Sequence, residues 1–380
     1  MSAAVHVADV TMFHAVHSGG VRRYLQEKRR WLRERPGYRH SLVLPSRAAA
    51  EGDDVVELPS LPLPFSHGYR LPLARRDATR ALVDLQPDVI EAGDPTHLAW
   101  AALEAGQRLG VPVIGFHHSD LPRAVARACG RTAGRLAEAY IRNLYRRFDL
   151  VLAPSRCMVE QLQALGVAQV EHQALGVDSH TFHPDRASKG WRLRLGAGPG
   201  DRLLVFAGRF AVEKNLPVLY SMLDRLGPGH ILVLVGGGSP PPAHPAVRVL
   251  PFIGNGSRLA ALIASCDLFV HAGDQETFGL APLEAMACGV PVVAARAGGL
   301  AELVDDSVGC AVPADDADTL AGGMAEAVCR LCAGELQPLR EAARRRAEGY
   351  DWERIVPTMA ARYASFGQRL EMSPVVPGLP

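Results

Sequence analysis

Short apolar, β-branched runs alternate along this chain with longer stretches in which apolar residues recur at helical spacing. In the first half we expect strands at Val5–Val10, Ser41–Leu44, Val55–Leu58, Asp88–Glu91, Val113–Phe116, Leu150–Ala153 and Gln169–His172. In the second half we expect them at Leu203–Ala207, Ile231–Val235, Val247–Leu250, Leu268–His271, Val290–Ala294 and Cys310–Val312. Such alternation predicts parallel sheets joined by crossover helices.

Because the alternation occurs twice, the chain is predicted to form two doubly wound α/β domains that face each other across a cleft. The first should span residues 1–175 and be completed by a C-terminal helix at about 355–372. The second should span residues 187–350, and the polar segment 176–186 is the expected linker. A length of 380 residues fits two domains better than one core.

The composition is that of a globular protein. With 48% hydrophobic residues and a formal charge of +1, the chain is neither disordered nor suited to coating nucleic acid. No signal peptide is expected at Met1–Phe13, and no apolar run is long enough to span a bilayer, which favours the cytoplasm. Scattered cysteines, including the lone pair Cys329 and Cys332, favour reduced thiols over a disulfide framework or a zinc site.

Residues 276–302 carry the most informative motif. Pro282 fits only in the first turn of a helix, so a helix should begin near Gly279 or Leu280. Gly289 suits the C-terminal cap of that helix. Its N-terminus would present free N–H groups and a positive dipole end beside Glu276. This arrangement predicts a site for a ligand that carries both phosphate and hydroxyl groups.

A second motif is Gly208-Arg209-Phe210-Ala211-Val212-Glu213-Lys214-Asn215. Lysine occurs only at positions 28, 189 and 214, so Lys214 stands out in an arginine-rich chain. A compact ammonium is a natural partner for phosphate. Four segments each follow a predicted strand: 18–21, 116–120, 208–214 and 274–284. Ligands of open parallel sheets bind beyond the carboxyl ends of strands. We therefore expect one composite site.

These motifs, taken in order, resemble retaining glycosyltransferases of family four, which have the GT-B fold. The resemblance covers most of the chain: it includes Gly-Gly-Val at 19–21, His-Ser-Asp at 118–120, Ala-Pro-Ser-Arg at 153–156 and Tyr-Asp-Trp-Glu at 350–353. It implies an enzyme that moves a hexosyl unit from a UDP- or GDP-hexose to a glycan or lipid-linked acceptor in cell-envelope glycan, polysaccharide or glycolipid synthesis. Neither a cofactor nor a nucleic-acid partner is implied.

The resemblance also implies roles for residues of the second half. Arg209 and Lys214 would hold the donor diphosphate together with the backbone amides of residues 278–280, which are Phe278, Gly279 and Leu280. Glu284 would accept hydrogen bonds from the ribose hydroxyls, and Glu276 would bind the donor sugar. Taken alone, Glu284 could be an ordinary helical glutamate, and Arg209 could pair with Glu213 on the surface.

In the first half, the resemblance places His118 near the donor sugar, with His117 as the alternative one position away. Gly19 and Gly20 would let the backbone approach the diphosphate closely. No metal is expected, because the basic side chains and the helix N-terminus can replace a divalent ion. Asp316-Ala317-Asp318 has the spacing of a metal-binding DxD motif, but it precedes an alanine-rich helix and is better explained as a helix cap.

Basic residues favour a peripheral contact with an anionic membrane. Seven of them fall between Arg22 and Arg35. Arg123, Arg127, Arg131 and Arg135 recur every four residues and should share one helix face. A solvated arginine face is the alternative. For the whole chain, the competing functions are a sugar phosphorylase or a sugar-nucleotide epimerase of the same fold, a non-catalytic nucleotide-sugar-binding partner, and a two-domain ligand-binding protein.

Overall fold

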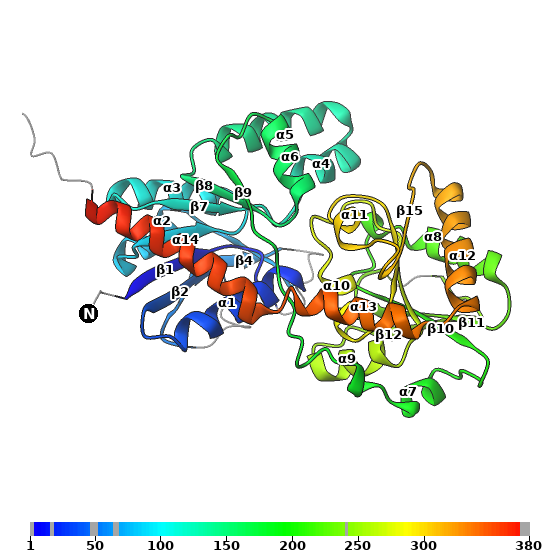
Figure 1. The fold of residues 1–380 in the computed structure, drawn as a ribbon. Coiled ribbons are helices and arrows are strands. Elements are labelled where there is room, and N and C mark those ends of the chain that lie inside the picture. Colours follow the sequence, from blue (N-terminus) through cyan, green and yellow to red (C-terminus); the bar gives the residue numbers. More distant parts are fainter. Residues whose placement is uncertain (1–3, 16–18, 46–51, 64–67, 240–241, 373–380) are drawn as a thin grey trace, which may run out of the picture. The chain divides into compact units, whose positions relative to one another are not determined.

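The computed structural model describes residues 4–15, 19–45, 52–63, 68–239 and 242–372 (Figure 1). The chain forms two compact units. The first unit comprises Met1–Pro154, Val159–Gln173 and Glu353–Pro380, and the second comprises Ser155–Met158 and Ala174–Trp352. The C-terminal helix α14 (Trp352–Met372) therefore returns the chain to the first unit.

The first unit is built on a parallel sheet in the order β3-β2-β1-β6-β7-β8-β9. Its strands are β1 (Val5–Val10), β2 (Tyr38–Leu44), β3 (Val55–Glu57), β6 (Val89–Ala92), β7 (Val113–Phe116), β8 (Leu150–Ala153) and β9 (Val170–His172). Its helices, besides α14, are α1 (Gly20–Arg33), α2 (Arg75–Leu85), α3 (His97–Leu109), α4 (Leu121–Cys129), α5 (Arg131–Tyr145) and α6 (Arg156–Ala164), the last of which begins in the second unit.

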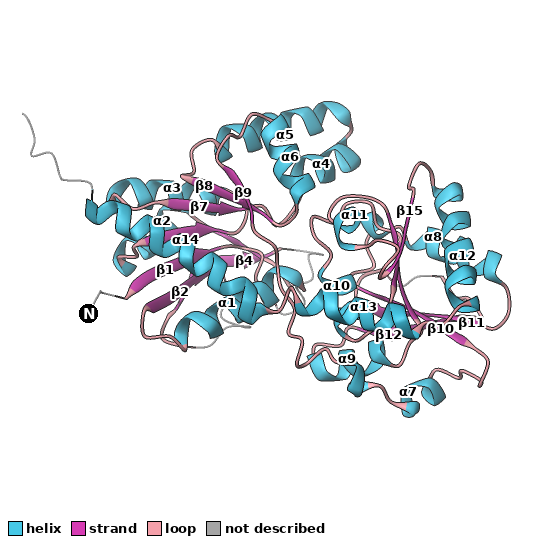
Figure 2. Ribbon diagram, in the orientation of Figure 1, coloured by secondary structure: helices cyan, strands magenta, loops and turns pink. Residues whose placement is uncertain are grey.

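The second unit repeats this plan with a parallel sheet in the order β12-β11-β10-β13-β14-β15, which has helices on both faces (Figure 2). Its strands are β10 (Arg202–Ala207), β11 (His230–Gly236), β12 (Val247–Pro251), β13 (Leu268–His271), β14 (Val292–Ala295) and β15 (Gly309–Val312). Its helices are α7 (Lys189–Arg194), α8 (Leu216–Leu226), α9 (Gly256–Ala264), α10 (Leu280–Ala287), α11 (Leu300–Leu303), α12 (Ala317–Ala333) and α13 (Gln337–Glu348), with short 3-10 turns η1 (Pro184–Arg186) and η2 (Val212–Lys214).

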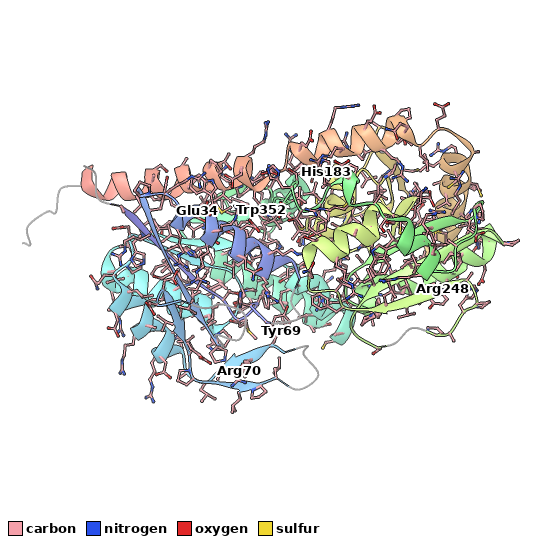
Figure 3. All side chains as sticks on the ribbon, turned by 90° about the horizontal axis from the view of Figure 1, so that it is seen from below. Glu34, Tyr69, Arg70, His183, Arg248 and Trp352 are labelled. Carbon is pink, nitrogen blue, oxygen red and sulfur yellow. The ribbon has the colours of Figure 1, made fainter. Side chains whose placement is uncertain are left out.

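Two doubly wound parallel sheets were predicted, and this part of the prediction is confirmed. The central strands fall where the apolar runs placed them because their residues are buried on both faces, as parallel strands under crossover helices must be. The sequence missed one element, a two-stranded antiparallel ribbon of β4 (Ser60–Pro62) and β5 (Arg70–Pro72). Figure 3 labels Arg70, the first residue of β5, and Tyr69, which precedes it.

A buried ion cluster joins the C-terminal helix to the first sheet. The ammonium of Lys28 on α1 lies 2.7 Å from Asp9 and 3.0 Å from Glu91, and the three side chains are almost fully buried. Tyr24 on α1 and Tyr363 on α14 both donate hydrogen bonds to Glu91. Burial raises the pKa of Glu91 to about 7, although Lys28 acts in the opposite direction. Helices α1 and α14 are thus fixed to the same face of the sheet.

The basic stretch at 22–35 is therefore much less available than its sequence suggests. Lys28 is buried in the cluster just described, and Arg29 pairs with Asp54. Arg30 and Arg35 both pair with Glu353 at the start of α14, at 3.1 and 3.2 Å. Much of its positive charge is used in packing the first unit.

The predicted shared face of Arg123, Arg127, Arg131 and Arg135 is wrong. Helix α4 ends at Cys129, and α5 begins at Arg131 after Gly130, which has a φ of 88°. Residues other than glycine rarely adopt that backbone angle, so the helix breaks at Gly130 although the spacing of the arginines continues. Two of the arginines lie on each helix, and all four are exposed.

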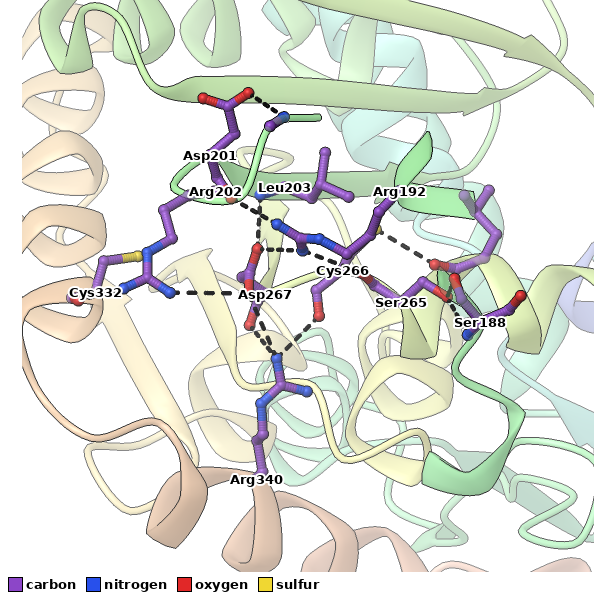
Figure 4. Close-up of polar contacts among 12 residues, drawn as sticks. Ser188, Arg192, Asp201, Arg202, Leu203, Ser265, Cys266, Asp267, Cys332 and Arg340 are labelled. Carbon is purple, nitrogen blue, oxygen red and sulfur yellow. Dashed lines mark hydrogen bonds and ion pairs between the residues drawn. The ribbon is translucent and has the colours of Figure 1, made fainter. Parts of the chain in front are cut away.

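An arginine cluster braces the amino end of the second sheet. Asp267, just before β13, accepts from the guanidinium of Arg192 at 3.0 Å and from the backbone N–H of Leu203 at 2.8 Å (Figure 4). Arg340 of α13 lies 3.9 Å from the other carboxylate oxygen and donates to the carbonyl of Cys266 at 3.0 Å. The cluster fixes α7 and α13 to the end of the sheet opposite the candidate site.

Candidate functional site

The loops that carry the two best motifs lie side by side at the carboxyl end of the second sheet. Residues 208–215 follow β10, residues 272–280 follow β13, and these strands are neighbours in the sheet. From β10 the chain proceeds outward to β11 and β12, whereas from β13 it proceeds the other way to β14 and β15. The order of strands reverses between β10 and β13, and such a switch point is where open α/β sheets bind ligands.

Close backbone packing shapes the 208–215 loop. A Cβ on Gly236 would lie 1.8 Å from the carbonyl oxygen of Gly208, so only glycine fits at the last position of β11. Asn215 adopts a left-handed conformation with a φ of 50°, and its side-chain amide donates to the carbonyl of Ala272 at 3.0 Å. Asparagine tolerates this conformation better than most residues. Asn215 thereby ties the loop to the end of β13.

The structure brings Lys214 and Glu276 together. Their side chains form an ion pair, and each is mostly buried, with 17% and 19% of its surface exposed. Burial alone would raise the pKa of the Glu276 carboxyl, but Lys214 and His271 outweigh it and hold that pKa far below its ordinary value. Glu276 is therefore ionised throughout the physiological range. The site offers a fixed carboxylate beside a fixed ammonium.

His271, the last residue of β13, is a site residue that the sequence did not reveal. Its Nδ1 accepts the backbone N–H of Gly273 at 3.1 Å, so a neutral ring must carry its proton on Nε2. Nε2 lies 3.1 Å from Oε1 of Glu276 and donates to it. The ring is buried and contacts that of Phe206. Ending an apolar run, His271 has the signal of a core residue, and only the fold shows that it orients Glu276.

Arg209 lies in the same loop but is paired differently. Its guanidinium is 3.3 Å from the carboxylate of Glu213, and both side chains are substantially exposed. The surface pair that the sequence left as an alternative is therefore present. An exposed pair of this kind is worth at most about 1 kcal/mol, so Glu213 would leave Arg209 for another anion at little cost.

Helix α10 begins as predicted, at Leu280, with Gly279 at its N-cap in a left-handed conformation (φ 111°). Gly289 follows the helix, also left-handed, and its N–H bonds to the carbonyl of Met286. The turn before α10 packs tightly: Gly299 donates to the carbonyl of Glu276 at 2.8 Å. Phe278 is buried at this turn. The geometry of this turn fixes the backbone of Glu276 relative to the N-terminus of α10.

Glu284 lies in the second turn of α10 and is only 3% exposed. This burial sets it apart from an ordinary solvent-facing helical glutamate. Its predicted contact with ribose hydroxyls stays a prediction.

The remaining predicted residues belong to the first unit. Gly19 and Gly20 lie at the start of α1, and a Cβ on Gly19 would meet no atom within 4 Å, so internal packing does not require glycine there. The ring of His118 stacks on that of Phe116 at 4.1 Å, and burial lowers the pKa of His118 to about 3. His117 is buried, its Nδ1 is 3.1 Å from the hydroxyl of Tyr145, and burial lowers its pKa to about 4. Both rings are neutral at pH 7.

One candidate metal motif is a helix cap. Asp316 caps α12 by accepting the backbone N–H groups of Asp318 and Thr319, both at 2.9 Å, which confirms the capping interpretation. The seven cysteines are free thiols. In the described ranges no three His, Cys, Asp or Glu side chains gather as a metal site requires. Nor do those ranges contain a helix with the length and hydropathy needed to cross a bilayer.

Both units match known families. A model described as "Glycosyl transferase 4-like domain" matches residues 19–178, and one described as "Glycosyl transferases group 1" matches residues 201–333. The second range contains Arg209, Lys214 and both candidate glutamates.

Individual proteins agree with the family models. Over 320 residues the chain is 32% identical to the "GDP-mannose-dependent alpha-(1-6)-phosphatidylinositol dimannoside mannosyltransferase" of Mycobacterium tuberculosis, which covers 80% of this chain and 81% of that protein. It is 33% identical over 266 residues to "Sulfoquinovosyl transferase SQD2" of Arabidopsis thaliana, covering 67% of this chain but only 52% of that relative. Sucrose-phosphate synthase from Thermosynechococcus elongatus superposes with a TM-score of 0.78 at 20% identity, over 97% of this chain and 100% of that one.

Proposed function

This chain belongs to the group 1 glycosyl transferases and has the GT-B fold, and from that premise we propose that it is a retaining hexosyltransferase. The proposed donor is a nucleoside diphosphate hexose, GDP-mannose before UDP-hexoses. The proposed acceptor is a lipid-linked or glycan component of the cell envelope. One relative supports both choices. It is a mannosyltransferase named for GDP-mannose and a phosphatidylinositol dimannoside, and it is 32% identical to this chain over most of its length.

The observation that carries this proposal is the cluster of Lys214, Glu276 and His271 at the switch point of the second sheet. Breaking the bond between sugar and diphosphate builds positive charge on the sugar and negative charge on the departing phosphate. An ammonium stabilises the second charge, and an ionised carboxylate can hold the sugar hydroxyls by accepting hydrogen bonds. The ion pair fixes these two groups in adjacent positions before the donor binds.

We further propose that no divalent metal is needed. Arg209 and Lys214 lie on one loop, and the N-terminus of α10 adds N–H groups and a positive dipole end. Together these groups can neutralise the diphosphate. The contribution of Gly19, Gly20 and His118 to the same donor stays a prediction, as does the cytoplasmic location.

A thermal-shift panel tests the donor. UDP, GDP and ADP are compared first, and then their hexose forms, each with and without EDTA. A ligand that binds only the native state at about 100 times its Kd adds about 2.7 kcal/mol of stability. We expect GDP and GDP-mannose to raise the melting temperature with EDTA present. A shift that appears only when a divalent metal is added would contradict the metal-free site, and donor binding without turnover would favour a non-catalytic binding partner.

A further inference from the structure

The β4–β5 ribbon of the first unit has an unusual distribution of leucines. Leu61 and Leu71 are directly paired across the ribbon, and side chains alternate between its two faces. Leu63, whose N–H bonds to the carbonyl of Tyr69, and Leu73, whose N–H bonds to that of Pro59, continue the same register. The four leucines therefore lie on one face, which we call the leucine face.

The leucine face points outward. Leu61 and Leu73 are each 59% exposed, Leu71 is 43% exposed and Leu63 is 40% exposed. On the opposite face Pro72 is buried, and the guanidinium of Arg70 donates to the hydroxyl of Ser60 at 2.9 Å and to its carbonyl at 2.7 Å. The usual amphipathic arrangement is thus inverted, with the apolar face in water. Clustered exposed leucines mark interaction surfaces.

Positive charge flanks this face. Helix α2 begins at Arg75, two residues after Leu73, and its first two turns carry Arg75, Arg76 and Arg80. Arg76 is 86% exposed and lies 3.8 Å from Asp77, and Arg75 is 55% exposed and lies 3.4 Å from Glu104. Exposed pairs of this kind are weak. An apolar patch beside exposed arginines is complementary to an anionic bilayer surface, where leucines enter the headgroup boundary and arginines meet lipid phosphates.

We propose that the leucine face is the surface by which this protein docks on anionic membranes. The proposal rests on the proposed function, since an enzyme acting on a lipid-linked acceptor must reach the bilayer. It differs from the basic helices that the sequence favoured: in the stretch at 22–35, Arg29, Arg30 and Arg35 already pair with carboxylates of the first unit. Two signals acting together, four leucines and adjacent arginines, suit reversible peripheral binding.

Flotation with vesicles tests the docking surface. The wild type is mixed at low and moderate salt with phosphatidylcholine vesicles that contain, or lack, about one third phosphatidylglycerol. We expect binding to the anionic vesicles, weaker at moderate salt. Fully burying a leucine is worth about tenfold to a hundredfold in an equilibrium constant. The Leu61→Ser/Leu73→Ser variant, losing two partly inserted leucines, should therefore bind about 10–100-fold more weakly.

The matched control is Leu193→Ser, which removes a leucine that is 76% exposed on α7 of the second unit and should leave binding unchanged. Arg75→Gln/Arg76→Gln should weaken binding severalfold and reduce its salt dependence. Melting temperatures confirm folding; if the double leucine variant unfolds, Leu73→Ser alone is used and should show about a tenfold loss.

Several outcomes would overturn the proposal. They are a wild type that floats with neither vesicle, a leucine variant that floats like the wild type, and a loss of flotation in Arg123→Gln/Arg127→Gln but not in the leucine variant. Sedimentation showing that the wild type self-associates through the leucine face would assign it to a second copy instead. The thermal shift with GDP, measured without vesicles, separates this result from the proposed function, because a failed membrane contact leaves nucleotide binding intact.

Discussion

The hydrogen bond from His271 to Glu276 gives the sharpest test of the site geometry. The ring is held by the N–H of Gly273 on one side and donates to the Glu276 carboxylate on the other. A hydrogen bond to a charged group contributes about 1.5–3 kcal/mol. If this bond holds Glu276 where the sugar hydroxyls meet it, removing it should lower kcat/KM by about 10–150-fold.

The replacement must separate this hydrogen bond from packing, because the His271 ring is buried. His271→Phe fills a similar volume but has no donor, whereas His271→Gln places an amide N–H near the former position of Nε2. We expect the phenylalanine variant to lose activity and the glutamine variant to recover most of it. Lys214 still pairs with Glu276 in both variants, so the affinity for GDP alone should change little.

The assay follows release of GDP from GDP-mannose, or of the nucleotide that the thermal-shift panel selects, with a lipid extract of the producing organism as acceptor. Titration calorimetry gives the Kd of the nucleotide, and melting curves confirm folding. If His271→Phe retains the wild-type kcat/KM, His271 does not position Glu276 for the reaction. Equal losses in the phenylalanine and glutamine variants would show that restoring an N–H donor does not restore activity, which would contradict the role given to this hydrogen bond.

Three further predictions concern charge. Lys214→Ala should lower kcat/KM by about 10²–10³-fold without unfolding the protein, as loss of a positive group facing the transition-state charge usually does. The control Lys189→Ala, which changes an exposed lysine, should match the wild type. Equal rates in both variants would show that Lys214 is not part of the site. Asp267→Asn should lower the stability of the second unit by about 1–2 kcal/mol in urea unfolding, because the partly buried Arg192 and Arg340 lose the charge of their carboxylate partner. Nucleotide affinity should not change. An unchanged unfolding midpoint would contradict this role. His14 is a buried residue of the first unit. Burial lowers its pKa and that of His117 to about 4 from an ordinary 6.5, so the unfolded chain binds more protons between those two pH values. Each ring should therefore contribute about 1–2 kcal/mol of stability at pH 7 that is lost by pH 5. A flat stability profile in urea melts over that range would refute the buried neutral rings.

Apolar patterning was sufficient for the sheets because a parallel strand is buried on both faces. Val113–Phe116, Leu150–Ala153 and Leu268–His271 have the bounds that their runs predicted. The β4–β5 ribbon could not be found this way, since Pro62 and Pro72 argue against a strand and its leucines face water. The rule that apolar residues lie inside the protein does not hold for a surface that binds a second molecule.

The ion pairs were beyond sequence reasoning for a different reason. Lys28 looked like part of a solvated basic helix because its partners, Asp9 and Glu91, lie on other elements. His271 looked like the end of an apolar run for the same reason. Residue type and spacing identified Lys214 and Glu276 as candidates, but only the neighbouring positions of β10 and β13 bring them into contact.

The central claim is that the carboxyl ends of β10 and β13 form the donor site of a glycosyltransferase. Its most direct test is transfer of labelled hexose from the selected donor to the lipid extract by the wild type, Lys214→Ala and Glu276→Gln. We predict a labelled lipid product with the wild type, and none above background with either variant, although both fold and melt cooperatively. Transfer by both variants at the wild-type rate, or no transfer by the wild type from any UDP-, GDP- or ADP-hexose, would contradict the claim.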